Sequence, residues 1–163
     1  MKQRRAILEA RGIKAFDGIS KTSTEHIMRI ITDGVKKNRR LSDITRSIVE
    51  SPVTGIESFD RANKIARTEV LTAVSIGKGA VMDDAEKKIP GMKKAWIHLD
   101  DGRVRKSHIA NQAKGAIGVK ETYEGGMRYP RDVNGPAEER IRCRCDLIMI
   151  PPDDLADLEI SEE

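Results

Sequence analysis

Two cysteines near the C-terminal end form the most specific chemical pattern in this sequence. Cys143 and Cys145 lie in the segment 142–145, Arg-Cys-Arg-Cys. If this segment is extended, alternate side chains share one face, so both thiols point the same way, and the flanking arginines favour thiolates. Two thiolates and one histidine would supply three ligands to zinc. His108 is the first candidate for the third ligand and His98 is the second. The alternative is that both thiols pack, half-buried, beneath a sheet.

A second set of polar side chains suggests a different chemistry. Carboxylates and imidazoles serve as general acids and bases, and the guanidinium group presents a planar fork to carboxylates and phosphates. A small nuclease or transferase would therefore be built on Arg67, Glu69, Asp101, Arg105 and His108. The first four are also expected to form an ion-pair network between the two halves of the chain. The sequence has no glycine-rich phosphate loop of the P-loop or dinucleotide type.

Helices are predicted in the first half of the chain, where they would position Arg67 and Glu69. A helix is predicted to begin near Ser23, with apolar residues at i, i+1, i+4 and i+8. A shorter helix begins at Leu41 and ends before Pro52. Ser58 is the predicted N-cap of the longest helix, from about residue 59 to residue 81. The inner face of this helix is predicted to comprise Phe59, Ala62, Ile65, Ala66, Ala73 and Ile76.

The second half of the sequence changes in pattern. Residues 94–99 alternate loosely and contain the only tryptophan, which indicates a strand. A turn over residues 100–102 leads into a short helix at 103–111, and residues 141–150 are rich in strand formers. We therefore predict an α+β protein, with a helical N-terminal part followed by a small mixed domain of two to four short antiparallel strands.

The charge distribution is uneven. The chain has 30 basic and 26 acidic side chains, but residues 151–163 carry six acidic groups and no base. Residues 1–67 hold 15 basic and 8 acidic side chains. A basic body favours contact with phosphates or with an acidic partner, although the charges could simply coat amphipathic helices. With only five aromatic residues, base stacking is disfavoured, so any contact with nucleic acid should be electrostatic.

Composition also excludes several classes of protein. No apolar run approaches the roughly 20 residues of a membrane span, and the basic N-terminal sequence leads into no apolar signal segment. Two cysteines cannot form a disulfide framework. These features favour a soluble protein made in a reducing cytoplasm.

Several of these features follow one another in an order that resembles the phage Mu protein F-like family of minor head, or head morphogenesis, proteins. The resemblance covers about residues 59–150 and depends on order and spacing, especially Arg-x-x-His followed about 35 residues later by Cys-Arg-Cys. The residues that carry it are Ala66-Arg67-Thr68-Glu69, Trp96, Asp101, Arg105, Ser107-His108, Ala110-Asn111, Gly126, Tyr129-Pro130, Asp132, Glu139, Ile141 and Cys143-Arg144-Cys145.

Three positions depart from the family pattern. Arg131 replaces a favoured glycine, Arg142 replaces a favoured asparagine, and Tyr123 replaces a frequent phenylalanine. We expect these differences to alter loop geometry and to leave the polar constellation intact.

The resemblance implies a minor capsid protein that acts at the portal vertex during head assembly. Its expected partners are the portal or other head proteins and, without sequence preference, DNA; no membrane contact is expected. Its expected location is the virion, and the host cytoplasm during assembly. The resemblance implies no established enzymatic activity. The expected organisation is a helical arm (1–57), a head morphogenesis domain (58–150) and an acidic tail (151–163).

Overall fold

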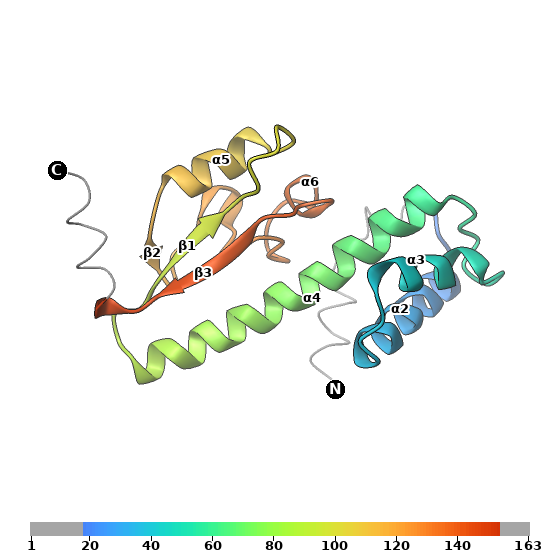
Figure 1. The fold of residues 1–163 in the computed structure, drawn as a ribbon, viewed down its shortest axis with the longest axis horizontal. Helices are drawn as coiled ribbons and strands as arrows, with labels where there is room; N and C mark the ends of the chain where they lie inside the picture. Colours follow the sequence, from blue (N-terminus) through green and yellow to red (C-terminus); the bar gives the residue numbers. More distant parts are fainter. Residues whose placement is uncertain (1–17, 154–163) are drawn as a thin grey trace.

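The computed structural model describes residues 18–153. Three helices occupy its first half: α2 (Lys21–Lys36), α3 (Leu41–Glu50) and α4 (Phe59–Lys88) (Figure 1). Ser20 caps α2 and Ser58 caps α4, each accepting a hydrogen bond from the backbone N–H three residues later. These bonds satisfy donors that the first helical turn leaves unpaired. The predicted cap of α4 is confirmed, whereas α2 begins ahead of Ser23.

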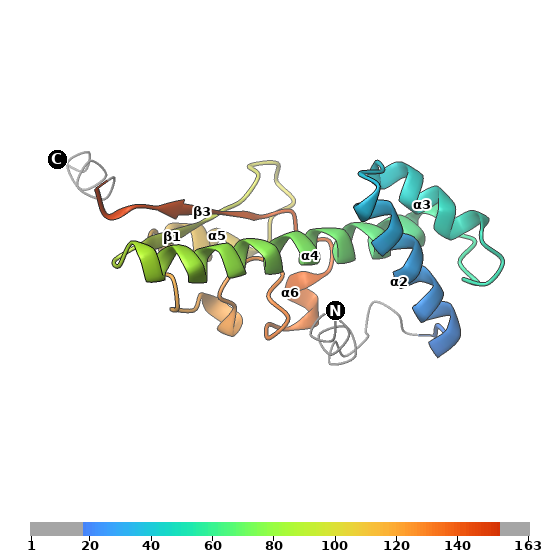
Figure 2. The same ribbon diagram turned by 90° about the horizontal axis from the view of Figure 1, so that it is seen from below.

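The helices α2 and α3 pack against the first half of α4 at one end of the molecule, as Figure 2 shows. Gly34 allows the close approach, because a Cβ at this position would lie 2.5 Å from Ile44 Cγ1. Aliphatic side chains dominate this core, and each gains about 1.5–3 kcal/mol from full burial. Its buried members are Ile27, Ile31, Ile44, Ile48, Ile56, Ala62, Ile65 and Ala66.

An antiparallel sheet lies beside the second half of α4. Its strands are β1 (Lys93–Ile97), β2 (Ile117–Gly118) and β3 (Asp146–Ile150), in the order β2-β1-β3. Trp96 of β1 lies opposite Leu147 of β3. The predicted α+β class, with helices first and short antiparallel strands after them, is confirmed.

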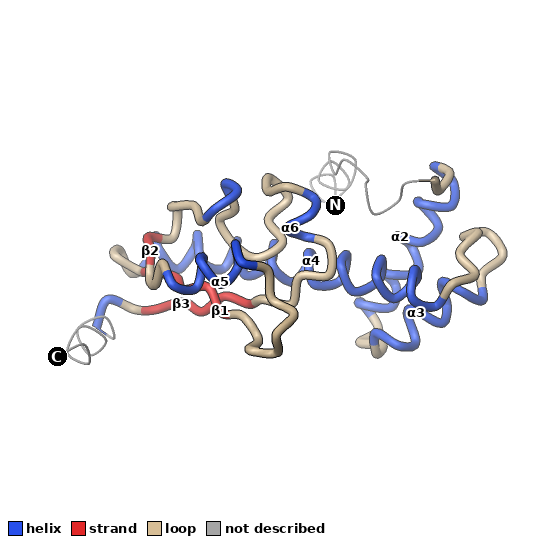
Figure 3. The backbone as a smooth tube through the Cα atoms, turned by 90° about the horizontal axis from the view of Figure 1, so that it is seen from above, coloured by secondary structure: helices blue, strands red, loops and turns tan. Residues whose placement is uncertain are grey.

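A second core joins this sheet to the helices around it. The short helix α5 (Lys106–Ala113) packs on β1, and in Figure 1 it lies on the side of β1 away from α4. The remaining elements are the 3-10 turn η2 (Glu124–Gly126) and the short helix α6 (Ala137–Arg140). Figure 3 shows that loops make up much of this half. The core comprises Met82, Met92, Trp96, Ile117, Val119, Tyr123, Met127, Cys143, Cys145 and Leu147.

The long helix differs from its prediction in two respects. It continues to Lys88, beyond residue 81. Phe59 and Ala73 of the predicted inner face are exposed. Because α4 serves two cores in succession, its buried stripe continues past Ala66 through small and polar side chains, which hydrophobic periodicity cannot detect. These side chains are Thr68, Glu69, Thr72, Ser75 and Gly79.

Most of the predicted acidic tail, and the first 17 residues of the predicted arm, lie outside the described residues. Across residues 18–153, no helix combines the length and the apolar character that a membrane span requires.

Candidate metal centre

The structure brings His108, Cys143 and Cys145 together, as the sequence predicted. His108 Nδ1 lies 3.2 Å from Cys145 Sγ and 3.8 Å from Cys143 Sγ. The side chains are buried, with 1%, 2% and 4% of His108, Cys143 and Cys145 exposed. His108 comes from α5, and the cysteines come from the segment that leads into β3. We call these three residues the Cys-His cluster. His98, the second candidate ligand, lies outside it.

Glu139 contacts the imidazole of His108 at Nε2, the nitrogen that does not face the sulfurs. Its Nε2 lies 2.8 Å from Glu139 Oε2, and Ser107 Oγ donates a hydrogen bond to the same carboxylate oxygen over 2.9 Å. The tilted indole of Trp96 packs on the ring, with centroids 5.2 Å apart. A carboxylate beside Nε2 favours the tautomer with its proton there. Nδ1 is the ring nitrogen that faces the two sulfurs.

Arg131 holds the backbone of the cysteine segment. Its Nη1 donates hydrogen bonds to the carbonyl oxygens of Cys143, at 3.1 Å, and Cys145, at 2.7 Å. Its Nε donates to the Leu71 carbonyl, and its Nη2 donates to Ser75 Oγ. The Gly-to-Arg departure at 131 therefore does more than alter loop geometry, because its side chain holds the cysteine segment in place. The guanidinium is buried and ties α4 to the cluster.

The two thiols differ in acidity. The pKa of Cys143 is lowered by a hydrogen bond from Cys145, by His108 and by the charge of Arg131. The pKa of Cys145 is raised by the same hydrogen bond and by burial. Cys143 is therefore the more acidic of the two thiols. The sequence predicts that the flanking arginines favour ionisation, but the cation that lowers the pKa of Cys143 is Arg131.

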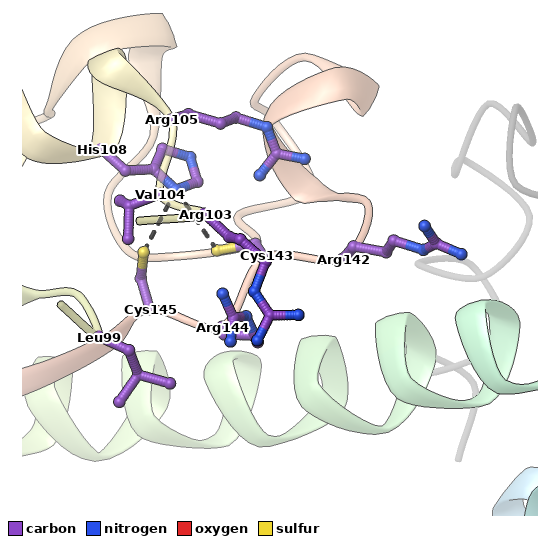
Figure 4. A pocket seen from close by; sticks show the side chains of 9 residues that line it. All are labelled: Leu99, Arg103, Val104, Arg105, His108, Arg142, Cys143, Arg144 and Cys145. Carbon is purple, nitrogen blue, oxygen red and sulfur yellow. Dashed lines mark hydrogen bonds between the residues drawn. The ribbon is translucent and has the colours of Figure 1, made fainter. Parts of the chain in front are cut away.

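A basic pocket adjoins the cluster. Figure 4 shows the Cys143 and Cys145 sulfurs pointing toward the His108 ring, with arginine side chains beside them. Its lining comprises Leu99, Arg103, Val104, Arg105, His108, Arg142, Cys143, Arg144 and Cys145. A ligand that entered this pocket would meet positive charge before it reached the sulfurs.

The predicted ion-pair network is wrong in the partners that it gives to Asp101 and Arg105. Asp101 forms a two-pronged pair with Arg144, and this pair holds the pKa of Asp101 below its usual value. Arg105 Nη2 instead donates to the Ile141 carbonyl over 2.6 Å. Glu69 is buried on α4. Asp101 and Arg105 both precede α5, which begins at residue 106, so these two residues share no helical turn.

The five residues of the enzyme hypothesis do not all line the basic pocket. Of the five, Arg105 and His108 line the basic pocket, while Arg67, Glu69 and Asp101 are absent from its walls. The histidine is buried against two sulfurs and a carboxylate.

Sequence reasoning missed Arg131 and Glu139 as parts of the site. Arg131 has a φ of 65° and Arg142 a φ of 58°, in the left-handed region that glycine and asparagine tolerate best. These are the two positions at which the chain departs from a favoured glycine and asparagine. A bulky residue at such a position was the available signal that its side chain has a specific role.

Comparison with known proteins gives one finding. The model of a family described as phage Mu protein F like protein matches residues 25–148. The match begins within α2, earlier than the expected residue 59, and it includes the whole Cys-His cluster with Arg131 and Glu139. Comparison with curated proteins and with solved structures gives no significant match.

Proposed function

Because this chain belongs to the phage Mu protein F-like family, we propose that it is a minor capsid protein that acts at the portal vertex. The family indicates a phage head morphogenesis protein, associated with the virion and with other head proteins as partners. The proposal adds the portal as the direct partner and DNA as a second, sequence-independent one. Family membership is the observation that carries it.

An exposed apolar strip supports a protein partner. Lys78 Nζ contacts Asp146 Oδ1 over 2.5 Å, which places one stripe of α4 beside β3. Val74 and Val81, four residues before and three residues after Lys78, lie on the same stripe of the helix and are exposed. On the sheet face that carries Asp146, two apolar residues are exposed, Ile97 of β1 and Ile148 of β3. Exposed apolar patches of this kind mark contact sites with other proteins. The strip comprises Val74, Val81, Ile97 and Ile148.

Co-expression with the portal protein of the same phage tests this partner. We expect a complex that survives gel filtration, and Ile148→Asp should weaken it at least ~10-fold, since an interface core tolerates an unpaired charge poorly. Val53→Asp is the matched control, because Val53 is equally exposed but lies between α3 and α4. Absence of a complex with the unaltered chain contradicts the proposal.

The turn between α2 and α3 supports contact with phosphates. Three of its four residues are basic, and so is Lys36 at the end of α2; all four basic side chains are exposed. Lys37 pairs with Asp33, and Arg39 donates a hydrogen bond to Ser47 Oγ. Lys36 and Arg40 are therefore the more adaptable cations. Binding of this kind releases counterions and weakens with salt, with a slope of about −0.9 per phosphate neutralised.

Titration against unrelated duplexes at two salt concentrations tests the DNA contact. We expect little sequence preference, and the double variant Lys36→Gln/Arg40→Gln should reduce the salt slope by about 2. The control is Lys87→Gln/Lys88→Gln at the far end of α4, which should leave the slope unchanged. Deleting residues 154–163 should strengthen binding, because this segment adds only negative charge. A slope insensitive to the turn variant contradicts this part of the proposal.

A further inference from the structure

The Cys-His cluster has the donor set of a transition-metal site. Thiolate and imidazole together select zinc among the common cellular divalent ions, whereas calcium and magnesium require oxygen ligands. The donor atoms of His108, Cys143 and Cys145 all lie within 4.8 Å of one another. No other group of this kind occurs among residues 18–153.

The distances match a tetrahedral ion. With Zn–S near 2.3 Å and Zn–N near 2.05 Å, tetrahedral angles separate each sulfur from the nitrogen by about 3.6 Å. The observed separations from His108 Nδ1 are 3.2 Å for Cys145 and 3.8 Å for Cys143. Each nitrogen–sulfur separation therefore needs to change by only a few tenths of an ångström to admit the ion.

The surroundings support the same ligand. Glu139 lies at Nε2 while Nδ1 faces the sulfurs, which is the arrangement by which carboxylates orient metal-binding histidines. The side chains of Cys143 and Cys145 are almost fully buried, so a nucleophilic thiol would be poorly accessible to a substrate. Two buried thiolates are costly unless a cation neutralises them, and a divalent ion would do so.

We propose that His108 Nδ1 and the thiolates of Cys143 and Cys145 bind one Zn²⁺ ion, with Glu139 as the positioning residue. Any thiol proton leaves to solvent as the ion binds. The fourth ligand is water or a small anion from the adjoining basic pocket, since the cluster offers three protein donors. The ion fastens α5 to the segment before β3 and closes the chain between residues 108 and 143.

Cobalt titration of the full chain, stripped of metal and kept reduced, tests the proposal. We expect one ion per chain, the d–d absorption of a tetrahedral site, and thiolate-to-cobalt charge-transfer bands that zinc abolishes. Cys145→Ser should lower the charge-transfer intensity and the affinity, while His98→Gln should change neither. A chain that binds less than half an equivalent, or binds without charge-transfer bands, overturns the assignment.

The positioning role has a separate readout. Glu139→Gln keeps the size of the side chain and removes its charge, and it should weaken cobalt binding about 10–100-fold with the same spectrum. Glu138→Gln, an exposed neighbour on the same short helix, is the matched control. Equal affinities for the two variants would overturn the role of Glu139. The titration uses the unaltered chain and these mild variants, so its result does not depend on whether a ligand variant folds, nor on the portal or DNA.

Discussion

Replacing Arg131 by alanine should destabilise the protein severely, although the residue lies in a loop. The guanidinium is buried and donates to the carbonyls of Cys143 and Cys145. These two carbonyls lie outside regular secondary structure. The same side chain donates to Ser75 Oγ on α4. Alanine would remove every one of these donors and leave the acceptors buried.

The magnitude follows from the number of stranded acceptors. Each buried acceptor left without a partner costs about 1–3 kcal/mol, so the two carbonyls together cost ~2–6 kcal/mol. Water that enters the vacated space would recover part of this free energy. We therefore expect Arg131→Ala to lower the free energy of unfolding by about 3–5 kcal/mol. For a chain of this length, the corresponding fall in Tm is about 10 °C.

A glycine variant separates backbone strain from hydrogen bonding. Arg131 has a φ of 65°, which alanine tolerates poorly and glycine tolerates freely. Arg131→Gly should therefore be about 1 kcal/mol less destabilised than Arg131→Ala, although it loses the same hydrogen bonds.

Urea unfolding at equilibrium, in the presence of a chelator so that metal does not contribute, measures both variants. Arg103→Ala is the control, because this exposed side chain should change stability by less than ~0.5 kcal/mol. The reasoning is refuted if Arg131→Ala lies within ~1 kcal/mol of the unaltered chain, or if glycine is no better than alanine.

Four further variants and one pH series test other parts of the structure. Arg142→Asn should raise stability by a few tenths to ~1 kcal/mol in urea unfolding, because asparagine tolerates the φ of 58° and the exposed ion pair it removes is worth little. Gly79→Ala should cost about 1–3 kcal/mol, because its Cβ would lie 2.6 Å from an aromatic ring carbon, whereas Gly77→Ala on the open face of the same helix should gain up to ~1 kcal/mol. Burial lowers the pKa of Lys94 to about 8, so the unfolded chain binds more protons above pH 8 and stability should rise with pH until about pH 10. Burial raises the pKa of Tyr123 to about 12, so the folded chain binds more protons above pH 10 and stability should fall there. Urea unfolding at each pH measures both effects. The variant Lys94→Met should lose the rise between pH 8 and 10 and keep the fall above pH 10.

Sequence patterns predicted the fold where burial is apolar and local. The starts of α3 and α4 followed from turn and capping residues, and β1 followed from the alternation around Trp96. The second half of α4 was harder, because its buried stripe consists of residues such as Thr72 and Gly79. Such residues pack against the sheet half without producing a hydrophobic period, and therefore the predicted helix ended too early.

The candidate site was partly accessible from sequence for a similar reason. Cys143, Cys145 and His108 could be grouped because their residue types are rare in this chain and suit one chemistry. Arg131 and Glu139 could not be grouped with them, since arginine and glutamate are common surface residues. Only tertiary structure shows that one is buried under the cysteine backbone and the other contacts the imidazole.

The location of the protein in the phage particle tests the central claim most directly. Purified heads of the phage that encodes the chain can be labelled with a specific antibody and examined by electron microscopy, with the protein-to-portal ratio measured by quantitative mass spectrometry. We predict label at a single vertex, the one that carries the portal, and a few copies of the protein per head. Heads that lack the protein, or that carry it evenly over the capsid, would contradict the account.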